Sequence, residues 1–255
     1  MQDRYLGDIG DFAKFGLLRA LVGDERGLRL GVLWYRVPDE SHTNDGRHID
    51  YLQPTAANIN RYRVCDPVLY DSLGALVRAG SRVVSAVSES RLLPADTTYH
   101  DEPLSFRDVA PGKRRAHREQ WLAKAHERVA DAALVFLDPD NGIEVKTDRH
   151  TREGPKYAYY DDVTPLSRAG KTVVIYQHAN RDGSFADQIR GRLAALQSRL
   201  GGPTEAFVAV RWLRLSPRAF IVAVASDHLT MMRTRLDGFL ASPWGRHFER
   251  VSPHS

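Results

Sequence analysis

The stretch LVFLDPDNGIEV, residues 134–145, joins an apolar run to a strongly polar one. Residues 134–137 are typical of a buried β-strand, because strands covered on both faces are short, continuously apolar runs bounded by turn residues. Three carboxylates, an amide, a proline and a glycine follow within seven residues, 138–144. This strand end is either an ordinary acidic turn or the edge of a site, and the rest of the chain helps to distinguish the two.

Helix-like and strand-like patterns alternate along the remaining sequence. Apolar residues at helical spacing predict helices over about 11–22 with Asp11 as N-cap, 67–79 between Pro67 and Gly80, 115–131, 161–170, 184–200 and 228–241, the last of which closes the chain. Strand-like runs cover 30–37, 81–88, 97–106, 133–138, 171–178, 205–213 and 218–226. The last two are separated by only 214–217, which predicts an antiparallel hairpin.

This alternation predicts an α/β fold. Strands that alternate with helices form a parallel sheet with helices on both faces. A mostly parallel sheet that ends in an antiparallel hairpin is the layout of the Rossmann-like methyltransferase sheet. We therefore expect this fold as a single domain over residues 1–255, with an N-terminal helical extension over about 1–27.

The composition is that of a soluble globular protein, with 42% hydrophobic and 27% charged residues. No apolar run approaches the roughly 20 residues of a membrane helix, and the first residues lack an apolar signal core. A single cysteine, Cys65, excludes an internal disulfide. We expect a cytoplasmic protein with no membrane partner. The net charge of +4 and the basic clusters around Arg114 and Arg214 leave nucleic acid, RNA or DNA, open as a partner.

Polar residues follow most of the predicted strands. The carboxyl ends of parallel strands meet at one edge of a sheet, where ligands bind in this architecture. Taken singly, each residue is better explained as part of a solvated turn, but their concentration favours a site. They are Asp39, Glu40, His42, Glu89, His100, Asp101, Asp138, Asp140, Glu144, Gln177, His178 and Arg181, with Asp8, Asp11 and Lys14 at the first helix.

Several short motifs occur in a characteristic order. Gly7, Asp8, Asp11 and Lys14 are spaced G-D-x-x-D-x-x-K on the first helix, and Glu40, His42, Gly46 and Arg47 form E-x-H-x-x-x-G-R. Asp66–Pro67 begins a helix and Asp138–Pro139 ends a strand. In this order, over about residues 5–181, the chain resembles the RlmJ-type ribosomal-RNA adenine-N6 methyltransferases, which use S-adenosylmethionine.

The resemblance implies a role for each matched position. It places the methyl donor against Lys14, Glu40, His42 and Gly46, with Asp66 and Glu89 near its amino-acid or ribose part. It also implies that the strand end 138–141 holds the target amine, with Asp138 as the orienting acid or base. Glu89 can also be interpreted as an exposed surface glutamate. Residues 44–46 can likewise be interpreted as a plain Asn-Asp-Gly turn.

The chain departs from the family pattern at two places. The loop before Gly46 reads T-N-D-G where the family has A-G-A-G, so that close backbone approach to a cofactor is less assured. The family's D-P-P-Y is here Asp138, Pro139, Asp140 and Asn141, with an amide in the aromatic position. An amide does not replace base stacking, which contributes roughly 1–3 kcal/mol.

Two other classes of function fit the same residues. A metal-dependent nuclease or phosphoesterase would use Asp138, Asp140 and Glu144, together with Asp8, Asp11 and His178, as hard ligands for Mg²⁺ or Mn²⁺. Lys14 or Lys156 would then steady a phosphate. A non-catalytic nucleic-acid-binding module would use the basic clusters alone, with binding that weakens steeply as salt is added.

Overall fold

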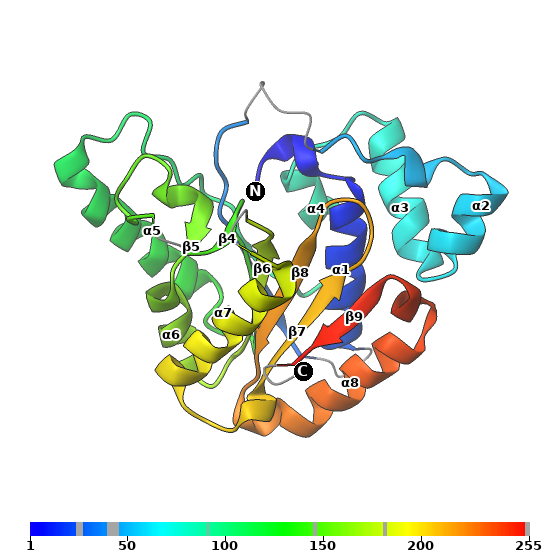
Figure 1. Ribbon diagram of the computed structural model, residues 1–255. Helices are drawn as coiled ribbons and strands as arrows, with labels where there is room; N and C mark the ends of the chain where they lie inside the picture. The colour runs from blue at the N-terminus through cyan, green and yellow to red at the C-terminus, as the bar shows by residue number, and fades with distance from the viewer. Residues whose placement is uncertain (24–27, 40–45, 91, 145–146, 181–182, 253–255) are drawn as a thin grey trace.

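The computed structural model describes the chain except for residues 24–27, 40–45, 91, 145–146, 181–182 and 253–255. A seven-stranded sheet in the order β2-β1-β3-β6-β8-β7-β9 forms its centre (Figure 1). The first four strands in this order are parallel, and β8, β7 and β9 are antiparallel to their neighbours. The strands are β1 Leu30–Trp34, β2 Thr98–His100, β3 Leu134–Asp138, β6 Thr172–His178, β7 Phe207–Trp212, β8 Arg218–Ala223 and β9 Phe248–Val251.

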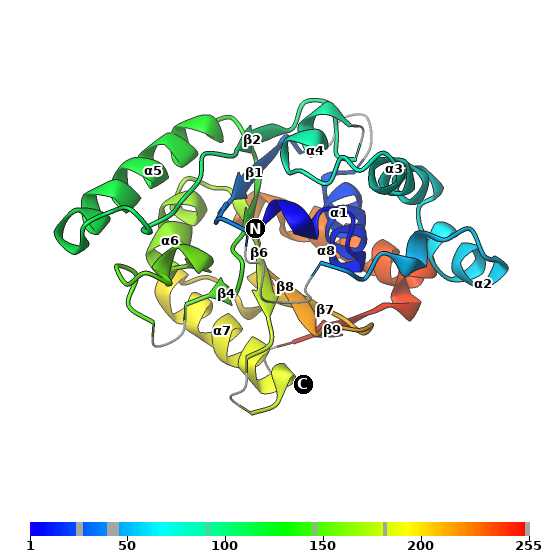
Figure 2. The ribbon, with the colours of Figure 1, turned by 90° about the horizontal axis from the view of Figure 1, so that it is seen from above.

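Helices cover both faces of this sheet, as seen from above in Figure 2. Helices α1 Ile9–Val22, α3 Pro67–Arg78 and α8 Leu229–Ala241 pack on one face, and α5 Arg114–Arg128, α6 Tyr160–Arg168 and α7 Phe185–Leu200 on the other. Successive strand residues alternate between the two cores: Leu134 and Phe136 contact the first, Val135 and Leu137 the second. The apolar run that opened the sequence is therefore a central strand, and the predicted Rossmann-like α/β fold is confirmed.

Shorter elements complete the chain. A two-stranded ladder, β4 with β5, lies outside the main sheet. Among the described residues no helix is both long enough and apolar enough to cross a membrane. The short elements are β4 Gly142–Ile143, β5 Tyr157–Ala158, α2 Ala56–Asn58, α4 Ser85–Glu89, the π-helical turn Ile59–Arg63 and the 3₁₀ turns Asp3–Tyr5, Asp50–Leu52, Pro111–Lys113, Gly154–Lys156, Thr204–Ala206, Ser226–His228 and Pro243–Arg246.

Three local predictions were wrong. Residues 81–88 do not form a strand: helix α4 covers Ser85–Glu89, and Val84 and Val87 are buried three residues apart, which is helical spacing. The N-cap of α1 is Asp8, whose side chain accepts a hydrogen bond from the Gly10 amide. The helix at 229–241 does not close the chain, because β9 follows it and pairs with β7.

Candidate active site

The acidic strand end lies at the carboxyl edge of the parallel strands, between β3 and β4. Asp138 is the last residue of β3 and is level with Trp34 of β1. The turn that follows is held by the small ladder, because the Asn141 amide donates to the Lys156 carbonyl at 2.9 Å. Gly142 has φ +107°, and a Cβ there would lie 2.6 Å from the Gln177 side chain, so this turn requires glycine.

Lys14 connects the motif of the first helix to the strand end. Its Nζ lies 2.9 Å from Asp11 Oδ1 and 2.9 Å from Asp138 Oδ2, and the three side chains are only 3–4% exposed. Burial by itself would lower the pKa of Lys14, but the two carboxylates outweigh burial and raise it above its ordinary value. Lys14 is therefore a buried cation that neutralises Asp138 at neutral pH.

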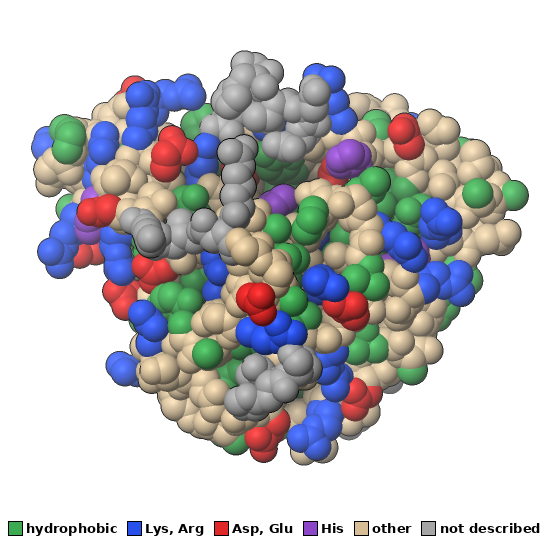
Figure 3. All heavy atoms as spheres, viewed as in Figure 1, with side chains coloured by type: hydrophobic (Ala, Val, Ile, Leu, Met, Phe, Trp, Pro, Cys, Tyr) green, Lys and Arg blue, Asp and Glu red, His purple; other side chains and the backbone are tan. Residues whose placement is uncertain are grey.

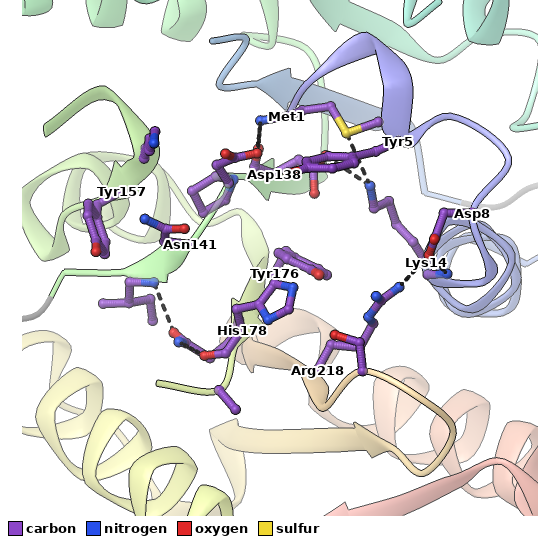
Figure 4. Close-up of a pocket in the computed structure, with 18 of the residues that line it drawn as sticks. Met1, Tyr5, Asp8, Lys14, Asp138, Asn141, Tyr157, Tyr176, His178 and Arg218 are labelled. Atoms are coloured by element: carbon purple, nitrogen blue, oxygen red, sulfur yellow. Dashed lines mark hydrogen bonds and ion pairs between the residues drawn. The ribbon is translucent and has the colours of Figure 1, made fainter. Parts of the chain in front are cut away.

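Asp140 points to a different set of partners. Its Oδ2 accepts a hydrogen bond from Gln2 Nε2 at 2.9 Å, and its Oδ1 lies 3.4 Å from the amino group of Met1. That amino group also donates to the Tyr35 carbonyl at 2.7 Å. The first residues thus lie over the ends of β1 and β3, and among the described residues the side chains of Asp138 and Asp140 accept from different donors, Lys14 and Gln2. The amino group of Met1 (Figure 4) lies near both residues, at the Asp138 carbonyl and at Asp140 Oδ1.

Arg218 forms the opposite wall. It is the first residue of β8, and the antiparallel register places it beside His178 at the end of β6. Its Nη1 lies 3.2 Å from Asp8 Oδ1, and its side chain is 8% exposed. Asp8 also accepts hydrogen bonds from the amides of Gly10 and His48, so one carboxylate joins α1, β8 and the segment at residue 48.

These residues enclose a pocket of about 570 Å³, a size typical of small-molecule sites. Four aspartates and four Lys or Arg side chains line it, and the Met1 amino group adds a further positive charge. The face of the molecule drawn in Figure 3 carries Lys and Arg side chains on both of its flanks. The lining residues are Met1, Tyr5, Asp8, Gly10, Asp11, Lys14, His48, Asp138, Pro139, Asp140, Asn141, Ile143, Lys156, Tyr157, Tyr176, Gln177, His178, Ala179, Asn180, Arg192, Ser216 and Arg218.

Part of the predicted site comes together here. Asp138, Pro139, Asp140, Asn141 and Lys14 all line the pocket, together with the helix-one aspartates and His178. Gly46 does not line it: a Cβ there would lie 2.7 Å from the Arg4 carbonyl, so this glycine packs beneath the first residues. Glu40 and His42 lie outside the described residues.

Two predicted cofactor residues are not brought to the pocket. Asp66 caps α3 by accepting from the Leu69 amide at 2.9 Å, and it pairs with Arg19 at 2.8 Å. With these two contacts the Asp66 carboxylate has a structural role at the start of α3. Glu89 is an exposed residue at the end of α4, which agrees with the competing interpretation as a surface glutamate.

The carboxylates proposed for a metal are bound to separate partners. Asp138 pairs with Lys14 and Asp140 with Gln2, while Glu144 accepts from the Tyr160 amide at 3.0 Å. Within the described part of the chain no three His, Cys, Asp or Glu residues are arranged to hold a metal ion.

Tyr176 was not predicted as a site residue, Arg218 was expected only as part of the basic cluster around Arg214, and Tyr157 was interpreted as a packing residue in preference to a base-stacking one. Arg218 and Tyr157 come from short strands whose position depends on register, which the local sequence does not specify. The predicted strand 218–226 opens at Arg218, but the sequence does not indicate which neighbour this residue faces. Tyr176 reads as an ordinary core residue within an apolar strand.

Comparison with known proteins adds no family. No family model matches the sequence, and no curated protein matches it. The crystal structure of protein LPL1258 from Legionella pneumophila, assigned to the family model DUF519, is similar over 96% of each chain, with 10% sequence identity and a TM-score of 0.37. A likeness at this level carries no information on function.

Proposed function

We propose that this protein is an S-adenosylmethionine-dependent methyltransferase that acts on an amine of a nucleic acid or a nucleotide-like molecule. The observation that carries the proposal is the ion pair between Lys14 and Asp138, 124 residues apart in sequence, at the wall of the polar pocket. It joins the helix-one motif to the strand-end motif, two of the four motifs whose combination carries the family resemblance. Two motifs that belong to one site must come together in the fold, and this ion pair joins these two.

Asp138 has the position for orienting an amine. Lys14 donates to its Oδ2, whereas Oδ1 has no hydrogen-bond partner among the described residues. A charged carboxylate oxygen accepts an N–H strongly, which fixes the direction of the nitrogen lone pair. The same oxygen can take up the proton that must leave after transfer. This is catalysis by positioning, assisted by a general base.

The residues present fit the proposed methyl donor. S-adenosylmethionine supplies an electrophilic methyl group on a sulfonium cation, and a cation is favoured beside carboxylates. Asp138 and Asp140 provide these carboxylates within a pocket of suitable size. Of the cofactor residues expected from sequence, Lys14 remains in the proposed set and Asp66 and Glu89 leave it.

An aromatic side chain lies beside the amide that replaces the family's tyrosine. The β4–β5 ladder pairs Gly142 with Tyr157, and this places Tyr157 next to Asn141 at the pocket wall (Figure 4). Tyr157 is partly exposed, so its ring is open to a ligand. We propose that Tyr157 supplies the stacking surface for the substrate ring, with roughly 1–3 kcal/mol at stake.

The test is isothermal titration with S-adenosylmethionine and S-adenosylhomocysteine, followed by transfer of labelled methyl to total cellular RNA and DNA. We expect the wild type to bind both ligands and to methylate one nucleic acid. Asp138→Asn should lose at least 100-fold in rate, within the range that a positioned acid–base group contributes. Asp131→Asn is the matched control, because Asp131 is 82% exposed and lies outside the pocket.

Two further variants separate parts of the proposal. Tyr157→Ala should weaken the substrate and leave cofactor binding unchanged, whereas Tyr157→Phe should behave as the wild type. Asp66→Ala should bind the cofactor normally, since Asp66 is a helix cap away from the pocket. If the wild type binds neither ligand, the methyltransferase proposal fails. Binding of Mn²⁺ in its place would then favour the phosphoesterase.

A further inference from the structure

Arg218 lies against the first turn of α1 more closely than any side chain there would allow. A Cβ on Gly10 would be 1.3 Å from Arg218 Nη1 and 2.5 Å from Cζ. Only glycine at this position lets the guanidinium reach Asp8, the N-cap of the helix. The helix N-terminus and the guanidinium therefore occupy the same corner of the pocket (Figure 4).

Most of the hydrogen-bonding capacity of Arg218 is unused. Among the described residues Nη1 contacts Asp8, while Nε is buried without a partner and Nη2 forms no hydrogen bond. A guanidinium carries five donors in a rigid fork that matches a carboxylate or a phosphate. Leaving buried donors without an acceptor costs free energy, and native proteins seldom do so outside functional sites.

The surroundings accept a negative group. The N-terminus of α1, which is 14 residues long, favours negative charge through its dipole, and its first amides already donate to Asp8 and to the His48 carbonyl. Arg192 lines the pocket as well, and the Met1 amino group adds a further positive charge to its wall. Asp8 and Asp11 oppose an anion, but Arg218 and Lys14 are paired with them.

We propose that Arg218, seated over Gly10, binds an anionic group of the pocket's ligand, a carboxylate or a phosphate. The inference concerns the same pocket and rests on the proposed function for the identity of the ligand, though not for its charge. A carboxylate would belong to the amino-acid part of the methyl donor, and a phosphate to a nucleotide substrate. Both are planar or tetrahedral oxyanions that accept two parallel N–H bonds from one guanidinium.

The test compares ligand pairs that differ mainly in the anion. S-adenosylhomocysteine is compared with its decarboxylated analogue S-(5′-adenosyl)-3-thiopropylamine, which keeps the amine and lacks only the carboxylate, and adenosine 5′-monophosphate with adenosine, each by isothermal titration. For the wild type we expect the member of one pair that carries the anionic group to bind at least tenfold more tightly, as hydrogen bonds to charged groups allow. Arg218→Gln should remove this preference and change binding of the member that lacks the anionic group by less than about twofold. The ligand pair whose preference is lost in Arg218→Gln shows whether the anion is the carboxylate or the phosphate.

Two more variants guard against an unfolded protein. Arg218→Lys keeps a positive charge for Asp8 but loses the fork, so it should fold and still lose most of the preference. Arg211→Gln is the matched control: Arg211 is an ion-paired arginine on β7, 2.5 Å from Glu249, and it does not line the pocket. It should retain the wild-type preference.

The outcomes separate this inference from the proposed function. If S-adenosylhomocysteine binds but both Arg218 variants keep the wild-type preferences, the inference fails and the methyltransferase proposal stands. If only adenosine 5′-monophosphate binds, and Arg218→Gln abolishes that binding, the anion site stands and the methyltransferase proposal fails. If none of the four ligands binds the wild type, the inference is overturned.

Discussion

Replacing Lys14 with methionine should be among the most destabilising single changes in this protein. Lys14 Nζ is 2.9 Å from both Asp11 and Asp138, and none of the three side chains is more than 4% exposed. Methionine fills a similar volume, so the loss is chiefly the charge. Removing one member of a buried ion pair costs about 3–5 kcal/mol, because the remaining charge is left without compensation.

Here two carboxylates lose the cation that they share, so we expect about 4 kcal/mol or more at pH 7. For a chain of this length that loss corresponds to a melting temperature lower by roughly 8–16 °C. Urea unfolding followed by circular dichroism measures the free energy directly. Lys124→Met is the matched control, since Lys124 and Glu102 are about half-exposed at 2.8 Å and should contribute less than about 1 kcal/mol.

The stability that Lys14→Met loses should depend on pH in one direction. Burial already raises the pKa of Asp11 in the wild type against the opposing charge of Lys14, so without Lys14 this pKa lies further above its unfolded value and the folded variant binds protons more readily. Its stability deficit should therefore be largest at neutral pH and shrink as the pH falls through the raised pKa. Adding Asp11→Asn and Asp138→Asn to Lys14→Met should recover most of the loss at pH 7.

The reasoning would be refuted by a deficit below about 1 kcal/mol at pH 7, which is the range of an exposed pair. A deficit that stayed constant between pH 7 and pH 5 would refute it equally, because buried unpaired carboxylates must respond to protonation. Full activity in Lys14→Met would count against the proposed role of Lys14 in holding the Asp138 carboxylate.

Two further predictions concern the fold. Burial lowers the pKa of His247, 0% exposed, to about 4, so stability should fall by up to about 3 kcal/mol as the pH drops from 6.5 to 4. His247→Gln should flatten that part of the profile in urea unfolding, and an unchanged slope would contradict the assignment. Gly31→Ala would place a Cβ 2.6 Å from Val129 Cγ1 and should lower the free energy of unfolding by about 1–3 kcal/mol. Gly191→Ala, whose Cβ would lie in open space on α7, should be neutral or stabilising by up to about 1 kcal/mol. Thermal melts that rank the two variants the other way would disprove the packing argument.

The sequence by itself determined the fold class and the edge of the sheet where the site lies. An apolar run such as 134–137 indicates a central strand, because burial on both faces of the sheet leaves no polar position in the strand. The polar segment that follows each run marks where the chain turns at the edge of the sheet. Pro67 and Gly80 bounded α3 because their backbone preferences are local. The order of the motifs along the chain was therefore enough to assign Asp138 and Lys14 to one site.

Only the tertiary structure decided what each charged group contacts. Asp66 follows the expected motif but points to Arg19 and the start of α3, and the Asp140 side chain accepts from Gln2 whereas that of Asp138 accepts from Lys14. Arg218 reaches the pocket through the antiparallel register of β8 on β6 and through the missing side chain of Gly10. Register and close approach depend on residues far apart in the chain, so local patterns do not encode them. The sequence can place a carboxylate at an edge, but the partner of that carboxylate is fixed by packing.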